Sequence, residues 1–184
     1  RLAVYFNFRT FVISKENPQR IKKTDDMKLT DKWFTAITEA EENDRLIIVC
    51  GRDQIQNFIE SGKFRERVEI YWKYAGDEKG MPAIQEAKLM EDVQDALRSA
   101  MEKDKLAILT GVYTGNNERT LVFYTRNIPA FGEMLNKALA GFDRLPIEIY
   151  TEKDAEWNEY TEMYELHRFS ETDDDTDDTP DEDL

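Results

Sequence analysis

The sequence contains little of what most catalytic and metal sites are built from. Its 184 residues include one cysteine, Cys50, and one histidine, His167. One cysteine cannot form an intrachain disulfide, so the fold has to rest on its apolar core, and a reducing compartment suits it. One histidine disfavours zinc sites and most histidine-based catalysis. No apolar run approaches the roughly 18 residues of a membrane-spanning helix, so we expect a cytoplasmic protein without membrane contact.

Basic charge is also scarce. Lys and Arg number 25 against 39 Asp and Glu, which gives a net charge of −14. Binding to phosphates needs a basic face, so direct nucleic-acid binding is not expected. The sequence has no phosphate-binding glycine loop and no Gly-x-Ser-x-Gly or Cys-x-x-Cys motif. Carboxylate pairs are so frequent that they indicate little about acid–base catalysis. We therefore expect no enzymatic activity, no cofactor and no metal.

The acidic charge is concentrated at the C-terminal end. Residues 169–184 contain nine acids and no base, so the rest of the chain carries a net charge of only −5. A run of like charge cannot bury apolar area, and we expect a disordered acidic tail. It either solubilises the protein or attracts the basic surface of a partner protein. The second interpretation makes five aspartates candidate binding residues: Asp173, Asp174, Asp175, Asp177 and Asp178.

The N-terminal end differs in charge from the rest. Residues 1–26 carry six bases and three acids. Residues 2–13 alternate loosely between apolar and other side chains and predict a strand, which a polar loop follows. Met27 is also a plausible natural start, in which case the first 26 residues are not native. We expect residues 27–168 to form a single domain, because the length and the apolar fraction of 40% suit one core.

The apolar pattern within this domain predicts alternating strands and helices. From residue 66 the predicted order is β-α-β-β-α-β, which is typical of a ferredoxin-like unit. In that α+β fold, two helices cover one face of a four-stranded antiparallel sheet, and here the earlier strands would extend an edge. The predicted segments are a hairpin at 33–40 and 46–50, a short helix at 53–60, a strand at 68–74, a helix at 84–103, strands at 106–113 and 119–126, a helix at 127–140, a strand at 145–151 and a helical segment at 154–166.

Several short motifs lie in a suggestive order. They are Gly80-Met81-Pro82, the helical stretch 89–93, the strand end Phe123-Tyr124 and a closing Asp154-x-x-Trp157-x-x-Tyr160. From Trp33 to Tyr160 the chain resembles the bacterial family known as domain of unknown function 695. The helix, the hairpin and the closing motif are also similar to the regulator of ribonuclease activity B family, whose acidic, ferredoxin-like members bind ribonuclease E as a protein. This resemblance implies a non-enzymatic binding domain and leaves its target open.

The closing motif supplies the other candidate binding residues. On a helix, Asp154, Trp157 and Tyr160 follow one side at three-residue steps. The favoured interpretation is structural: the two rings hold the C-terminal segment against the sheet, and Asp154 lies near a helix N-terminus. The alternative is an exposed aromatic binding surface. We further expect Cys50 to be a small buried side chain and His167 to be exposed at a helix end.

The expected function follows from these patterns. We expect a non-enzymatic protein-binding or regulatory domain whose partner has a basic surface, for example an acidic inhibitor of a nuclease or toxin. The alternatives are a small-ligand-binding domain or an enzyme, with a cleft between the sheet and the N-terminal hairpin, and a homo-oligomer that pairs through an open sheet face or edge. We expect a monomer or a homodimer.

Overall fold

The computed structural model describes residues 27–173, and it contains one six-stranded sheet and four helices. The expected strand at 2–13 and Asp174, Asp175, Asp177 and Asp178 lie outside the described residues. Within residues 27–173, no helix has the length and apolar character needed to cross a bilayer. In chain order the elements are β1 (Trp33–Glu39), β2 (Leu46–Arg52), α1 (Gln56–Glu60), β3 (Glu66–Lys73), α2 (Ile84–Lys103), β4 (Ala107–Gly115), β5 (Glu118–Thr125), α3 (Ile128–Leu139), β6 (Ile147–Lys153) and α4 (Asn158–Asp173).

The sheet has the strand order β1-β2-β4-β5-β3-β6, and every neighbouring pair is antiparallel. The expected α+β class is therefore confirmed. The expected hairpin is β1 with β2, and its second strand pairs with β4, so the hairpin forms one edge of the sheet. The other edge is β6.

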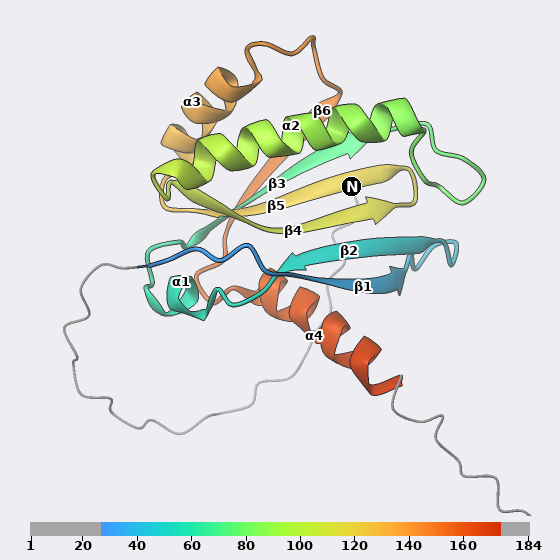
Figure 1. Ribbon diagram of the computed structural model, residues 1–184, viewed down its shortest axis with the longest axis horizontal. Coiled ribbons are helices and arrows are strands. Elements are labelled where there is room, and N and C mark those ends of the chain that lie inside the picture. The colour runs from blue at the N-terminus through green and yellow to red at the C-terminus, as the bar shows by residue number, and fades with distance from the viewer. Residues whose placement is uncertain (1–26, 174–184) are drawn as a thin grey trace, which may run out of the picture.

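Helices cover both faces of the sheet. α2 and α3 lie on one face, and α1 and α4 lie on the other (Figure 1). Two separate clusters of buried side chains correspond to these faces, one containing Leu97 and Phe123 and the other containing Val49 and Trp157. The expectation of two helices on one face thus describes only half of the packing, because the second face has its own helical cover.

α2 is the longest helix, and its apolar pattern makes it easy to predict from the sequence. Met90, Val93, Leu97 and Met101 are all buried, and they recur at steps of three and four residues. The start of α3 is equally clear, since Asn127 Oδ1 accepts a hydrogen bond from the Ala130 N–H at 2.9 Å.

Two glycines make room on the sheet for the Phe34 ring of β1 and for the Met163 side chain of α4. Gly51 on β2 lies opposite Gly111 on β4. A Cβ atom at Gly51 would collide with the Phe34 ring, and one at Gly111 would collide with the Met163 side chain. The missing side chains therefore make room for the second core.

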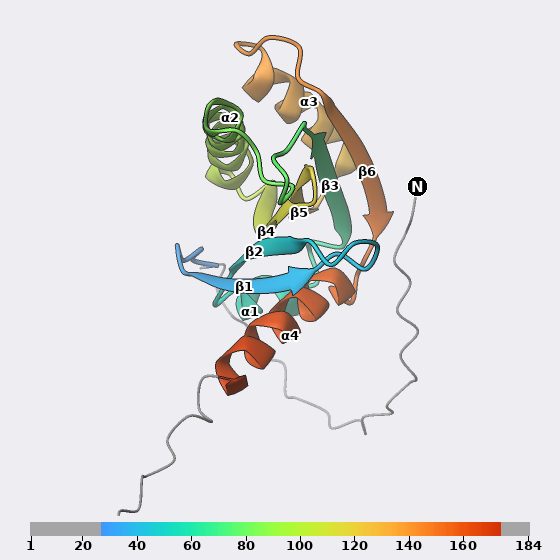
Figure 2. The ribbon, with the colours of Figure 1, turned by 90° about the vertical axis from the view of Figure 1, so that its right-hand side faces the viewer.

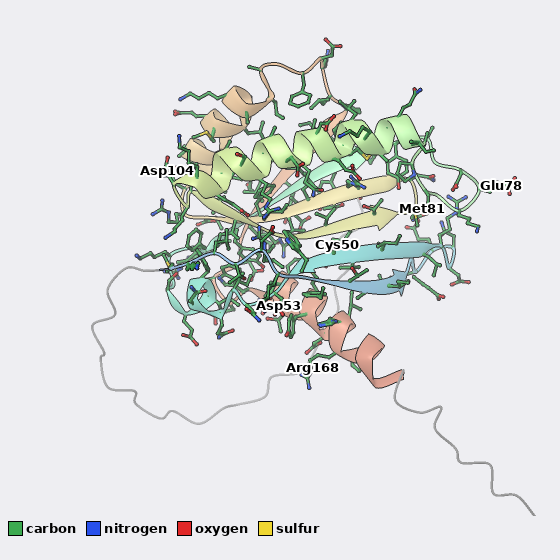
Figure 3. All side chains as sticks on the ribbon, viewed as in Figure 1. Cys50, Asp53, Glu78, Met81, Asp104 and Arg168 are labelled. Atoms are coloured by element: carbon green, nitrogen blue, oxygen red, sulfur yellow. The ribbon has the colours of Figure 1, made fainter. Side chains whose placement is uncertain are left out.

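The Gly80-Met81-Pro82 motif is part of the loop before α2, at the end of the sheet (Figure 3). The Gly80 carbonyl accepts hydrogen bonds from the Tyr74 hydroxyl at 2.9 Å and from the Asn117 N–H at 3.0 Å. Gly80 has φ +79°, and an added Cβ would lie 2.9 Å from Asn116 Cα. The motif thus fixes this loop on the β4–β5 turn.

Candidate protein-binding surface

The closing motif anchors α4 to the sheet. The Asp154 carboxylate accepts hydrogen bonds from the N–H groups of Asn158 and Glu159, at 2.9 and 3.2 Å, which satisfies free donors at the start of the helix. The Tyr124 hydroxyl donates to the same carboxylate at 2.6 Å. The Trp157 ring stacks on the Tyr124 ring, with centroids 3.9 Å apart. These contacts join the helix start to the C-terminal end of β5.

The three motif residues are buried rather than exposed. Asp154, Trp157 and Tyr160 have exposed fractions of 5%, 1% and 6%. The Tyr160 hydroxyl donates to the Arg52 carbonyl at 2.7 Å, which ties α4 to β2. The structural interpretation of the motif is therefore confirmed, and the alternative of an exposed aromatic binding surface is wrong. Aromatic rings of this size contribute most when they pack in a core.

α4 also extends the folded part of the chain. It continues through Phe169 to Asp173, so the first residues of the expected acidic tail are helical. His167 is half-buried and stacks on the Phe34 ring with centroids 4.5 Å apart, which corrects the expectation that it is exposed.

Cys50 and His167 lie on opposite faces of the sheet. Cys50, on β2 (Figure 3), is partly buried and packs on the core beneath α2. His167 contacts Phe34, which belongs to the core beneath α4. A nucleophilic cysteine needs a base in hydrogen-bond reach, so these two residues do not form a catalytic pair.

A buried ion cluster holds the start of the described chain to the sheet. Arg52 is 1% exposed, and its guanidinium donates to the Thr30 carbonyl at 2.6 Å and to the Glu102 carboxylate at 2.7 Å. The guanidinium also lies over the Trp33 ring, 4.3 Å from its centroid. Burial lowers the pKa of Arg52, while the Glu102 carboxylate raises it. Because every polar contact here is internal, we assign the cluster to stability.

The second face of the sheet is only partly covered. α4 packs on β1, β2 and β4. Figure 2 shows it beneath β1, with β6 along the opposite edge. Side chains on β3 alternate between the faces, so Val68, Ile70 and Trp72 enter the core beneath α2 while Glu69 and Tyr71 face the other way. Within the described residues, the β3, β6 and early β5 part of this face carries no helix.

This uncovered area is rich in carboxylates and tyrosines, and we call it the acidic sheet face. Strand register places Tyr71 between Thr120 and Glu148, and it places Glu69 opposite Tyr150. Glu148, Tyr150 and Glu152 are exposed, and Tyr71, Glu118 and Thr120 are partly exposed. The acidic sheet face consists of Glu69, Tyr71, Glu118, Thr120, Glu148, Tyr150 and Glu152.

Two cations, Arg67 and Lys73, lie on this face, and they do not balance its carboxylates. Arg67, at the end of the face, has its guanidinium 2.8 Å from Glu69 and 2.7 Å from Glu152. The same side chain lies 3.6 Å from Asp154 and 3.8 Å from Glu159. Four carboxylates thus share one arginine. Three tyrosine hydroxyls also donate hydrogen bonds to these carboxylates, but they are neutral and do not compensate the negative charge. Tyr71 donates to Glu69, Tyr150 to Glu152 at 3.2 Å, and Tyr113 to Glu159 at 2.9 Å.

The excess of negative charge perturbs the carboxyl groups themselves. Burial raises the pKa of Glu118, and the nearby Glu148 and Glu69 carboxylates raise it further, although Thr120 and Lys73 oppose the shift. Burial likewise raises the pKa of Glu159, and Glu69 adds to the effect. A raised carboxyl pKa means that the folded protein holds this charge at a cost, which an added cation would relieve.

A hollow of about 250 Å³ lies on the other face, between α3 and the loop before β6. It is smaller than the roughly 300–1,000 Å³ of typical ligand pockets. Within the described part of the chain, no group of three or more His, Cys, Asp or Glu side chains has the geometry to hold a metal ion. The lining of the hollow is Leu135, Asn136, Leu139, Phe142, Asp143, Arg144, Leu145 and Ile147.

Comparison with protein families gives a match over residues 31–164, to the family of unknown function DUF695. This chain belongs to that family. The comparisons with curated proteins and with solved structures found no match. The DUF695 match runs from just before β1 into α4, so it includes the acidic sheet face and the buried motif at 154–160.

The sequence analysis did not identify the acidic sheet face, although a signal was present. Glu148, Tyr150 and Glu152 alternate with Ile147 and Ile149 on one short segment. Their cross-strand partners, Tyr71 opposite Glu148 and Glu69 opposite Tyr150, lie 77 or more positions earlier in the sequence. Only the register of β3 with β6 brings these residues together.

Proposed function

We propose that this DUF695 domain is a protein-binding module without catalysis of its own, and that its acidic sheet face binds a basic surface of a partner. The observation that carries the proposal is the group of carboxylates around Arg67, Tyr71 and Tyr150, which is short of cations. Glu148 and Glu152 of this group are exposed, while Glu69 is buried beside Arg67. Lys or Arg side chains of a partner would supply the missing positive charge. Charge complementarity of this kind speeds encounter and selects partners.

The tyrosines add contact area to this charge. Tyr150 is 46% exposed, and Tyr71 is partly exposed beside it. Tyrosine rings bury a large apolar area, stack on guanidinium groups and are enriched among the residues that dominate binding energy. Their hydroxyls are already bonded to glutamates, so the rings are held in place before binding. A rigid surface loses less entropy when a partner docks.

The remaining expectations are part of the same proposal. A ferredoxin-like unit from β3 to β6 is supported by the strand order β4-β5-β3-β6 and by the position of α2 and α3 on one face. The sequence motifs that resemble the regulator of ribonuclease activity B family support a nuclease or a toxin as the class of partner, and we propose that the two meet in the cytoplasm. The acidic C-terminal residues would add long-range attraction to the same basic surface.

The test is site-specific photo-crosslinking in the native host. A benzophenone amino acid replaces Tyr150 on the acidic sheet face or, as a matched control, Glu133 on the exposed side of α3. We expect one abundant crosslinked protein from position 150 and none in common with position 133. The captured protein is then purified, and its affinity is measured by calorimetry at low and high salt.

The affinity measurement decides between the outcomes. We expect Glu148→Lys to weaken binding at least about tenfold and to reduce its salt dependence, while Glu133→Lys changes neither. Equal affinities for the two variants would overturn the role of the acidic sheet face. A crosslinked molecule that proves to be a metabolite or substrate would instead favour the ligand-binding alternative.

A further inference from the structure

The β1–β2 hairpin exposes a row of large aliphatic side chains on the face that carries α2. Ile37, Leu46 and Ile48 are 60%, 48% and 39% exposed. Ile37 lies directly opposite Ile48, and Leu46 lies opposite Glu39, so the three form one continuous patch that we call the hairpin apolar row. The other face of the same hairpin is buried beneath α4. Contiguous exposed aliphatics of this kind mark interaction surfaces.

The backbone of β1 is also open along its outer side. At the two ends of the pairing with β2, Ala40 N–H donates to Arg45 and Asp53 N–H donates to Lys32, both at 2.8 Å. Hydrogen-bonded pairs alternate along an antiparallel ladder. The backbone groups of Thr35 and Ile37 therefore point away from β2, and no strand within residues 27–173 lies beyond them.

The two edges of the sheet differ in protection. Most protein edges carry lysines, prolines, bulges or charges that prevent pairing with another strand. β6 carries Glu148, Glu152 and Lys153. β1 contains neither lysine nor proline, and its seven residues pair with β2 in an unbroken register. A strand whose only charged residue is Glu39 at its end, beside exposed isoleucines, is a surface suited to pairing.

We propose that β1 pairs with β1 of a second copy of this chain, antiparallel about a two-fold axis at Ile37. This register extends the sheet across two subunits and places Ile37 against the partner's Ile37, so the two hairpin apolar rows become continuous. A closed two-fold contact uses one patch twice and stops at a dimer.

Charge supports a second copy as the occupant. In this register Lys32, at the entrance to β1, lies opposite the partner's Glu42 in the hairpin turn. Both side chains are exposed. The acidic sheet face is at the opposite edge, on β3 and β6, so the two copies keep these surfaces apart and free. Beyond a Debye length of about 8 Å at physiological salt, the remaining repulsion between the copies is largely screened.

The experiment measures the mass of the full chain by sedimentation equilibrium over a wide range of concentration. We expect a monomer–dimer equilibrium that shifts toward dimer as salt rises, because both copies are acidic. Ile37→Lys should weaken the dimer at least about tenfold, since it puts two charges at the axis. Ile149→Lys is the matched control, because Ile149 is a 49%-exposed isoleucine on the other edge strand. It should leave the dimer unchanged.

Hydrogen exchange distinguishes the other possible occupants. In the unchanged protein, the amides of Thr35 and Ile37 should become more protected from exchange as concentration rises and the dimer forms. The Ile37→Lys variant should remain folded but should not show this gain in protection. A monomer at every concentration overturns the proposal. So does protection of these amides that is independent of concentration and lost on deletion of residues 1–26, which would assign the edge to that segment. A dimer that Ile149→Lys breaks and Ile37→Lys leaves intact also overturns it.

Discussion

The ring of Trp157 lies flat on the ring of Tyr124, with centroids 3.9 Å apart and an angle of 2° between their planes. Trp157 has φ +59°, a left-handed conformation that a bulky residue rarely adopts. The stack therefore outweighs a backbone conformation that costs about 1–3 kcal/mol. This ring comes just before the first turn of the C-terminal helix and is one of the contacts that hold the helix to the sheet.

Replacement of Trp157 tests how much of the fold depends on the stack. We expect Trp157→Ala to lower the free energy of unfolding by about 3–5 kcal/mol, because a buried indole leaves a cavity. Trp157→Phe keeps a ring on Tyr124 and should cost less than half as much. Urea unfolding followed by circular dichroism measures both. A loss of less than about 1 kcal/mol for Trp157→Ala would show that α4 is held mainly by other contacts.

The buried Arg52–Glu102 pair gives a second stability prediction. Glu102→Ala should lower the free energy of unfolding by about 3–5 kcal/mol, because it leaves the Arg52 guanidinium buried without its carboxylate. The double variant Arg52→Met, Glu102→Leu should cost clearly less than Glu102→Ala alone, since it removes both charges. A double variant that is as unstable as the single one would mean that Arg52 contributes by packing against Trp33 rather than by its charge.

Replacing Gly80 or Gly132 with alanine should change the stability of the domain in opposite directions. At Gly80, φ is +79° and an added Cβ would meet the backbone of Asn116, so Gly80→Ala should destabilise the domain by about 1–3 kcal/mol. At Gly132, inside α3, an added Cβ would have no atom within 4 Å apart from its chain neighbours and the backbone of its own helix. Gly132→Ala should therefore stabilise the domain by about 0.5–1 kcal/mol. Thermal unfolding compares the two, and shifts of the same sign would contradict the backbone argument.

The sequence predicts regular elements well where one apolar periodicity dominates. The expected helix at 84–103 coincides with α2, because its buried stripe repeats every three or four residues. The hairpin of β1 and β2 is also confirmed, although helix and strand signals conflict around Trp33. The second helical layer was harder to predict. α4 has few aliphatic residues, and its burial rests on aromatic rings and on space left by Gly111.

The features that could not be predicted from the sequence depend on contacts between residues far apart in the chain. The ion pair of Arg52 with Glu102 joins residues 50 positions apart, and nothing near Arg52 in the sequence indicates a buried arginine. The acidic sheet face likewise depends on the register of β3 with β6. By contrast, the structural role of Asp154, Trp157 and Tyr160 was predictable, since large rings beside a helix start most often serve packing.

The carboxyl groups of the acidic sheet face predict a conflict between stability and binding. Burial raises the pKa of Glu118 in the folded state above its ordinary value near 4.5. A carboxyl group whose pKa is raised on folding contributes stability below its unfolded pKa and loses it as pH rises through the folded pKa. At pH 7 the ionised Glu118 therefore destabilises the fold. Glu118→Gln should raise the melting temperature by about 1–2 °C at pH 7 and should weaken partner binding.

The pH dependence provides the control for that variant. The difference in melting temperature between Glu118→Gln and the unchanged protein should shrink as pH falls below the ordinary pKa near 4.5, because Glu118 then becomes increasingly protonated in both the folded and the unfolded state. Glu133→Gln, on exposed α3 surface, should show no such trend. A stabilisation by Glu118→Gln that stays constant from pH 7 to pH 4 would mean that shape or hydrogen bonding, and not charge, is responsible.

The acidic C-terminal residues give the last prediction, which concerns rates. Because α4 reaches Asp173, the deletion should begin at residue 174 so that the helix is kept. Residues 174–184 contain seven acids and no base. Their removal should slow association with the partner about three- to tenfold at low salt and leave the dissociation rate almost unchanged, because long-range attraction acts mainly on encounter. Stopped-flow measurements at several salt concentrations separate the two rates. Association rates that are equal with and without these residues, at every salt concentration, would assign them a solubilising role and leave binding to the acidic sheet face alone.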